Sequence, residues 1–313
     1  MPALPFPRLP FPARLRPFLP ALACGLGIAC FSVMDALMKQ SSLSAGVFTA
    51  VFWRTAIGTA IATPLWLTSG KARWPGRGML ALHGLRTLAV AGMVLLFFWG
   101  LVRTPMAVGM ALSFIAPLIA LLLAALFLGE PVTRRALAAS ALGLAGVVVI
   151  GAGRLGAGPT RGDSLAGMVA ILGSAVLYAV NLVIQRHQAQ QVSGREIVFF
   201  QNALFVVALL PAVPFFGHLP HGHIWLLIAL AACLALTSIL LLSWGWARAE
   251  AHRLLPVEYS AFLWSALMGR WWFGEALGLP TLAGVVLIVA GCWIGASAGA
   301  GEEGPPHIEQ TAL

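Results

Sequence analysis

Charged side chains are scarce in this chain of 313 residues. Asp, Glu, Lys and Arg make up only 9% of it, whereas 60% of the residues are hydrophobic. Soluble domains carry about 25% charged and about 45–50% apolar residues, so this chain has too few ionic side chains to coat a soluble globule of its size. A mean hydropathy of +0.91 also excludes a disordered chain. The composition therefore predicts a membrane protein.

Cysteine and clustered basic charge are also lacking. The cysteines lie inside apolar segments without the CxxC spacing of a zinc site, and we interpret them as small buried hydrophobic residues. They are Cys24, Cys30, Cys233 and Cys292. The net charge of +9 does not indicate a nucleic-acid partner, because the 19 Lys and Arg residues are dispersed between apolar runs. Neither a disulfide framework nor nucleic-acid binding is expected.

Convincing sequence motifs for nucleotide binding or metal binding are missing as well. No Walker-type phosphate loop is present, so transport powered directly by ATP is excluded. Residues 151–156 fit GxGxxG, but no strand precedes them, and we do not interpret them as a dinucleotide site. We interpret His218, His221 and His223 as part of a hydrated loop rather than as a metal site. No cofactor, metal site or catalytic residue is predicted.

Long apolar segments take up most of the chain. A helix needs about 20 apolar residues to cross about 30 Å of hydrocarbon, and ten segments meet this requirement. They run approximately over 19–38, 46–67, 79–100, 106–128, 136–153, 165–184, 197–216, 223–245, 254–273 and 277–298. Their short spacers leave no room for a soluble catalytic domain. The sequence therefore predicts an all-α integral membrane protein with ten transmembrane helices.

The two ends of the chain differ from these segments. Seven of the 20 prolines fall within residues 1–20, and we predict that residues 1–18 form a basic, proline-rich cytoplasmic lead-in rather than a cleaved signal peptide. Residues 299–313 contain three glutamates and two prolines and are predicted to be a disordered cytoplasmic tail.

The distribution of basic residues predicts the orientation. With the amino terminus inside, twelve Lys and Arg residues fall in cytoplasmic segments and five on the outer side. The inner set is Arg8, Arg14, Arg16, Lys71, Arg73, Arg77, Arg134, Arg135, Arg186, Arg195, Arg248 and Arg253; the outer set is Lys39, Arg103, Arg154, Arg161 and Arg270. This bias follows the positive-inside rule and predicts that both termini are cytoplasmic.

The sequence repeats itself at a spacing of 145 residues. This shift aligns rare residue types without a gap: Trp99, Gly100 and Arg103 with Trp244, Gly245 and Arg248, and Gly129-Glu130 with Gly274-Glu275. The repeated unit contains five predicted spans, over residues 19–153 and 165–298. Because five is odd, the second copy enters the membrane from the opposite side, and the two units are predicted to form an inverted repeat.

The duplicated blocks resemble a known family. ALSFIAPLIALLLAALFLGE and LLPVEYSAFLWSALMGRWWFGE each end a fourth span with Gly-Glu, and they are similar to the paired EamA domains of the drug/metabolite transporter superfamily. MDALMKQ followed by FWRT is similar to a bacterial subgroup of it. The resemblance implies ten helices, cytoplasmic termini, a central cavity between the repeats and alternating-access movement of small metabolites.

Ionisable residues inside predicted spans mark candidate functional positions, because a charge in hydrocarbon is costly unless it faces a partner or water. Asp35 lies four residues before Lys39, so that the two can pair on one helical face, and Arg54 lies within reach of Asp35. A structural ion pair between Asp35 and Arg54 and a gate on the outer side are both open interpretations.

Arg86 and Glu258 form a second candidate pair, each placed a few residues into a span from the predicted cytoplasmic side. A static ion pair, or an Arg86 side chain that extends to the interface, is one interpretation. In the functional alternative, Arg86 binds an anionic group of the substrate, and Glu258 binds an ammonium group or a coupling proton.

Helix-breaking prolines indicate the same region. Pro117 leaves the carbonyl group of Ser113 without its intrahelical donor, and Pro256 lies two residues before Glu258. Ser113 and Glu258 are equivalent at the spacing of 145 residues. Interrupted backbone at matching places in two inverted halves is typical of transporter sites, although a kink that only improves packing is the alternative.

Neutral polar and aromatic residues complete the set of candidates. Side chains that can line a cavity without the cost of a full charge are Tyr178, Asn181, Gln201, Asn202 and Tyr259. Trp99 and Trp264 could stack on a planar part of a ligand, but anchoring at the membrane interface is the commoner role of a single Trp in such a chain.

These features predict a secondary transporter of the bacterial plasma membrane that moves a small polar organic metabolite, amino-acid-like or purine-derived. We favour efflux or exchange by alternating access, driven by protons or by the substrate's own gradient. Uptake of an S-adenosylmethionine-type metabolite is the alternative, and a channel is the nearest competitor from another class. An intramembrane enzyme is disfavoured because the spans hold no histidine apart from His83. Gly291 and Gly295 form a GxxxG motif suited to packing within the bundle or in a homodimer.

Overall fold

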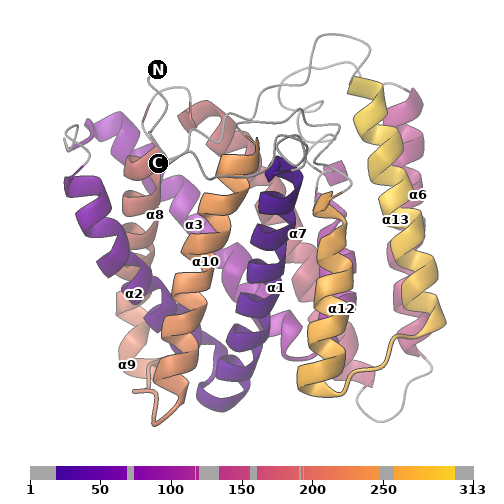
Figure 1. Ribbon diagram of the computed structural model, residues 1–313, viewed down its shortest axis with the longest axis horizontal. Coiled ribbons are helices and arrows are strands. Elements are labelled where there is room, and N and C mark those ends of the chain that lie inside the picture. The colour runs from indigo at the N-terminus through magenta and orange to yellow at the C-terminus, as the bar shows by residue number, and fades with distance from the viewer. Residues whose placement is uncertain are drawn as a thin grey trace.

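The computed structural model of the chain is a bundle of helices whose axes are roughly aligned (Figure 1). It describes residues 19–68, 74–116, 118–119, 134–155, 161–189, 192, 194–246 and 257–299. Within these residues the secondary structure is helical and no strand occurs. The predicted lead-in over 1–18 lies outside the described residues, as does the predicted tail apart from Gly299.

The helices fall into two groups along the chain. Before residue 156 the structure has α1 (Leu19–Ala45), α2 (Val47–Leu67), α3 (Arg77–Leu101), α4 (Met106–Ser113) and α6 (Arg134–Leu155). After residue 160 it has α7 (Arg161–Ala189), α8 (Gly194–Leu209), the 3₁₀ turn η2 (Leu210–Ala212), α9 (Val213–Phe216), α10 (Ile224–Trp246), α12 (Ser260–Phe273) and α13 (Leu279–Gly299).

Five described helices are long and apolar enough to cross a membrane, over Leu19–Ala45, Arg77–Leu101, Gly162–Asn181, Glu196–Phe216 and Ile224–Leu242. Many large apolar side chains on the outside of the bundle are exposed, among them Leu279 at 80% and Trp271 at 78%. Exposed apolar surface of this extent is typical of a bundle surrounded by lipid.

Proline and glycine set the ends of several elements. The predicted span 197–216 is divided, because Pro211 and Pro214 interrupt the regular helix and a 3₁₀ turn separates α8 from α9. Gly46 has a φ of 84°, which lets α2 start directly after α1 ends. Gly274 has a φ of 64° and ends α12, and the following N–H of Glu275 donates to the Gly269 carbonyl at 3.0 Å.

The main helix contacts join one group to the other. α1 packs against α10, α3 against α7, α2 against α8 and α6 against α13. Glycines allow close approach, as a Cβ added at Gly100 would lie 2.5 Å from the Gly167 carbonyl oxygen. On α13, a Cβ added at Gly284 would lie 2.7 Å from the Gly146 carbonyl oxygen. Small residues at such crossings are typical of helix packing in membranes.

The buried core has two parts. One is formed by residues from α1, α2, α3 and α8, such as Phe52, Val94 and Phe205. The other is formed by residues from α4, α6, α7, α12 and α13, such as Ile150 and Ile171. Most of the polar side chains considered below lie on these densely packed helices, whereas Thr104 and Glu275 lie on links between helices.

Candidate functional site

Arg86 on α3 is buried and contacts two side-chain amides of α7. Its Nε donates to Oδ1 of Asn181 at 2.9 Å, and its Nη1 donates to Oε1 of Gln188 at 3.2 Å. Asn181 and Gln188 lie seven residues apart, which places both on one face of α7. The sequence singled out Arg86 and Asn181, and the structure brings them together. The sequence analysis did not single out Gln188, although its helical spacing from Asn181 was a signal that could have identified it.

Gln188 continues the network to His83. Because its Oε1 accepts from Arg86, its Nε2 is the atom that donates to Nδ1 of His83, over 3.1 Å. The proton of the neutral His83 ring is then on Nε2, which faces Oε1 of Glu196 at 3.6 Å. His83 also stacks on Phe200 with ring centroids 5.1 Å apart. A buried polar chain therefore runs from α3 through α7 to the start of α8.

Glu258 lies two residues before α12, near groups on α1 and α7. Its carboxylate interacts electrostatically with the thiol of Cys24 on α1 and with the phenol of Tyr178 on α7. Tyr178 is 41% exposed. The described hydrogen-bond partners of Arg86 are the amides of α7, so an ion pair between Arg86 and Glu258 stays a prediction.

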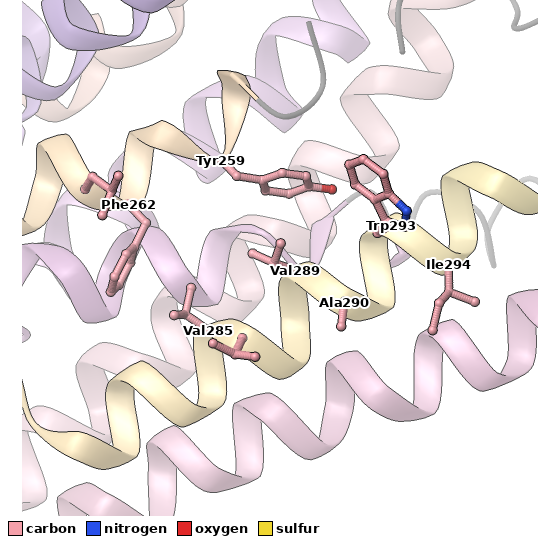
Figure 2. A pocket seen from close by; sticks show the side chains of 9 residues that line it. Tyr259, Phe262, Val285, Val289, Ala290, Trp293 and Ile294 are labelled. Atoms are coloured by element: carbon pink, nitrogen blue, oxygen red, sulfur yellow. The ribbon is translucent and has the colours of Figure 1, made fainter. Parts of the chain in front are cut away.

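Tyr259, the residue after Glu258, lines a shallow apolar groove (Figure 2). The groove has a volume of about 510 Å³ and lies between α12 and α13; its lining is Tyr259, Phe262, Leu263, Val285, Val286, Val289, Ala290, Trp293 and Ile294. On its other side Tyr259 meets Phe114 edge to face, with ring centroids 5.5 Å apart. Since α12 and α13 both follow residue 160, this groove is not the predicted cavity between the two halves.

The remaining candidates near the interrupted helices have local partners. The Ser113 hydroxyl donates to the carbonyl of Gly109 on its own helix at 2.9 Å. Pro117 lies outside the described residues, as does Pro256. Gln201 is partly buried on α8.

Trp99 and Trp264 are both partly exposed, at 38% and 37%. Arg103 stacks on Trp99 with its guanidinium carbon 3.7 Å from the ring centroid, and its Nη1 donates to the Trp99 carbonyl at 2.9 Å. A Trp held by Arg at the end of a helix is typical of an interfacial anchor.

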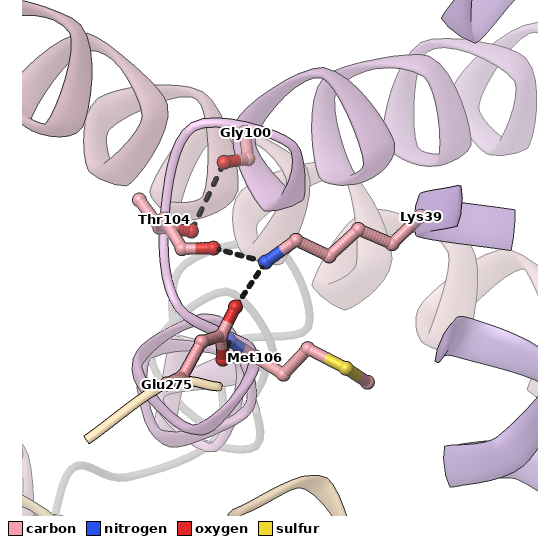
Figure 3. A network of polar contacts seen from close by, with 5 residues as sticks. All are labelled: Lys39, Gly100, Thr104, Met106 and Glu275. Atoms are coloured by element: carbon pink, nitrogen blue, oxygen red, sulfur yellow. Dashed lines mark hydrogen bonds and ion pairs between the residues drawn. The ribbon is translucent and has the colours of Figure 1, made fainter. Parts of the chain in front are cut away.

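The charges of α1 pair differently from the sequence prediction. Lys39 does not pair with Asp35; its Nζ lies 2.5 Å from Oε1 of Glu275 and donates to the Thr104 carbonyl at 2.8 Å (Figure 3). The prediction was wrong because it considered only neighbours on the same helix, whereas Gly274 turns Glu275 toward α1. Oε2 of Glu275 accepts from the backbone N–H of Met106 at 2.7 Å.

Asp35 and Arg54 do lie near each other. Asp35 is buried, and its carboxylate interacts electrostatically with the Arg54 guanidinium. Nε of Arg54 is buried without a hydrogen-bond partner among the described residues. The two side chains do not form a close ion pair in this conformation, and a role of this pair as a gate stays a prediction.

The fold and these buried polar side chains define a multi-pass helical membrane protein. The sequence matches the EamA-like transporter family over residues 19–152 and again over 165–295. The chain belongs to this family, as the duplicated Gly-Glu blocks indicated, and it is a membrane transporter of small molecules.

Some curated relatives of this chain are named as exporters. A pseudopaline exporter of Pseudomonas aeruginosa is 29% identical over 84% of this chain and 90% of its own length. A protein named "Probable terminal-alkyne amino-acid exporter" from Streptantibioticus cattleyicolor is 29% identical over 68% of this chain and 71% of its own length. One solved crystal structure superposes with a TM-score of 0.59 at 24% identity, over 91% of this chain and 98% of that chain, and it bears on the fold alone.

Proposed function

We propose that this protein exports a small, polar, amino-acid-like metabolite across the bacterial plasma membrane by alternating access. The observation that carries the proposal is the double match to the EamA-like transporter family, together with the exporter names of its relatives. Ten spans form two five-helix repeats, over 19–153 and 165–298, with both termini cytoplasmic.

The helix pairing supports an inverted repeat. At the spacing of 145 residues, α1 corresponds to α7 and α10 to α3, so the contact of α1 with α10 is the counterpart of the contact of α7 with α3. The contacts of α2 with α8 and of α6 with α13 each join an element to its own counterpart. This pattern, in which each contact has a counterpart in the other unit or joins an element to its own counterpart, is expected for two units related by a two-fold axis in the membrane plane.

The substrate site lies next to the contact of α1 with α12, with Glu258 as the acidic group. Tyr178 and Tyr259 add a hydroxyl each, and Glu258 binds the ammonium group of the substrate or a coupling proton. The electrostatic link of Glu258 to groups on two other helices supports this position. Arg86, held by the amides of α7, attracts the substrate's carboxylate when the halves move.

Counterflow in proteoliposomes tests this function. Purified protein is reconstituted with an unlabelled amino-acid-like compound inside, and uptake of the labelled compound is followed. A carrier gives a transient overshoot, whereas a channel gives none. A panel of neutral, acidic and basic amino acids and of purine nucleosides serves as the set of probes.

The proposed role of Glu258 has a matched control. Glu258→Gln is expected to lower the counterflow rate at least tenfold with normal insertion, while Asp163→Asn, an exposed acid in the first turn of α7, leaves the rate unchanged. Equal rates for both variants would exclude Glu258 from the site. Absence of overshoot with every probe in the parent protein would contradict the proposed substrate class.

A further inference from the structure

Lys39, Thr104, Met106 and Glu275 form one network, called here the Lys39 network (Figure 3). Lys39 comes from α1, Thr104 comes from the link between α3 and α4, and Met106 is the first residue of α4. Glu275 comes from the link between α12 and α13 and thus from the other half of the chain. The ammonium group also lies 4.8 Å from the centroid of the Phe273 ring. A single lysine therefore ties three separate segments and both halves together.

Contacts that do not involve Lys39 fix the positions of Glu275 and Thr104. The left-handed Gly274 and the hydrogen bond from Glu275 N–H to Gly269 fix the turn after α12. A Cβ added at Gly269 would collide with the Glu275 carboxylate, so this glycine provides the space for it. The Thr104 hydroxyl donates to the Gly100 carbonyl at 3.0 Å at the end of α3. Both partners of Lys39 are thus preorganised.

Burial makes this contact costly to break. The Lys39 residue is only 4% exposed, and the side chain of Glu275 is 16% exposed. The attraction between the two charges is stronger in these buried surroundings than it would be for the same pair fully exposed to water. The network therefore favours the conformation in which these segments touch.

The equivalent positions in the other half differ in sequence. Glu275 corresponds to Glu130 at the spacing of 145 residues, whereas Lys39 corresponds to Ile184, with the basic Arg186 two positions further on. The carboxylate is thus repeated at the equivalent position, whereas the lysine is not.

We propose that the Lys39 network is a latch that keeps the outer side closed in the empty carrier, so that the resting protein exposes its site to the cytoplasm. The proposal rests on the proposed function, which supplies the membrane orientation and the two alternating conformations. Loading from the cytoplasm is the order of events that an exporter needs, and a closed outer side in the empty carrier provides it.

Labelling of a buried cysteine tests the latch. In a background in which Cys24, Cys30, Cys233 and Cys292 are replaced by serine, Thr281→Cys serves as the reporter, because Thr281 is 4% exposed and lines a small hollow beside Glu275. A membrane-impermeant maleimide is added outside intact cells. Glu275→Gln and Lys39→Met are each expected to raise the labelling rate at least tenfold.

Three further variants separate the latch from a general loss of structure. Glu196→Gln makes the same chemical change in a carboxylate that lies 3.6 Å from the neutral His83 ring and is expected to leave the outer labelling rate unchanged. The reversal Lys39→Glu with Glu275→Lys is expected to return the rate toward that of the parent. Gly269→Ala displaces the Glu275 carboxylate without removing a charge and is expected to raise the rate, so it keeps the test decisive if a charge variant fails to insert.

The outcomes distinguish this proposal from the proposed function. If Glu275→Gln and Gly269→Ala label no faster than Glu196→Gln while counterflow persists, the latch is overturned and the carrier function stands. If the reporter reacts only in inside-out vesicles, the membrane orientation is wrong and the proposed function fails with it.

Discussion

The guanidinium group of Arg86 and the amide of Asn181 bridge the contact between α3 and α7, with Nε donating to Oδ1 at 2.9 Å. Both residues are buried, at 5% exposed each. A buried cation is tolerated only when polar groups replace its water, and here the described replacements are side-chain amides of a neighbouring helix. The same contact that stabilises the charge therefore also fixes α3 against α7.

Asn181→Leu is expected to destabilise the protein by about 1.5–3 kcal/mol, because it removes an acceptor from a buried charged donor. Thermal unfolding in detergent measures the change. Asn202→Leu is the matched control, since the Asn202 amide donates to the carbonyl of Val198 on its own helix and joins no second helix through that bond. An effect at Asn181 no larger than that at Asn202 would mean that the bridge contributes nothing specific.

Gln188 and His83 are expected to be energetically coupled, because one amide is hydrogen-bonded to both His83 and Arg86. A double-mutant cycle with Gln188→Leu and His83→Phe should give a coupling of about 0.5–3 kcal/mol, as is usual within one hydrogen-bonded network. Phe is chosen because it retains a ring next to Phe200.

The control for this cycle combines Gln188→Leu with Thr237→Val on α10, where the exposed Thr237 hydroxyl donates only to Cys233 of its own helix among its described contacts. These two changes should add within about 0.5 kcal/mol. Additivity in both cycles would show that His83 and Gln188 act independently.

The sequence predicted the helical, membrane-embedded class because hydrophobic runs and scarce charge depend on composition and local order alone. It also identified Arg86, Asn181 and Asp35 as unusual, since a polar residue inside a span is visible without any partner. The family assignment was confirmed by the two matches to the EamA-like transporter family.

The same reasoning could not predict which residues pair between different helices. Lys39 was assigned to Asp35 four residues away, but it pairs with Glu275, which is 236 positions along the chain. Helical spacing predicts contacts on one helix only, whereas this pair depends on the backbone turn at Gly274 and on the packing of the two halves. Gln188 was overlooked although its spacing from Asn181 places both on one face of α7, because its partners Arg86 and His83 lie on another helix.

Gly100→Ala is expected to destabilise the protein, because the new Cβ would lie 2.5 Å from the Gly167 carbonyl oxygen and would push α3 away from α7. Cores and close helix crossings respond to such overpacking with a loss of about 1–3 kcal/mol. Gly84→Ala on the same helix is the control, since a Cβ there meets nothing within 4 Å. That variant should be neutral or more stable by up to about 1 kcal/mol, because Ala favours helix. Thermal unfolding of the two variants side by side tests the predicted opposite signs.

Gly274→Ala is expected to weaken the turn that presents Glu275 to Lys39. A φ of 64° is strained for any residue with a Cβ, so the substitution should cost about 1–2 kcal/mol in thermal unfolding. Gly278→Ala, four residues further on, has no such backbone strain and would place its Cβ in ordinary contact with Pro280 at 3.6 Å. If both substitutions lower the unfolding temperature equally, the left-handed turn is not what holds the carboxylate. If only Gly274→Ala does so and also exposes the reporter at position 281, the backbone of this turn and the Lys39 network act as one unit.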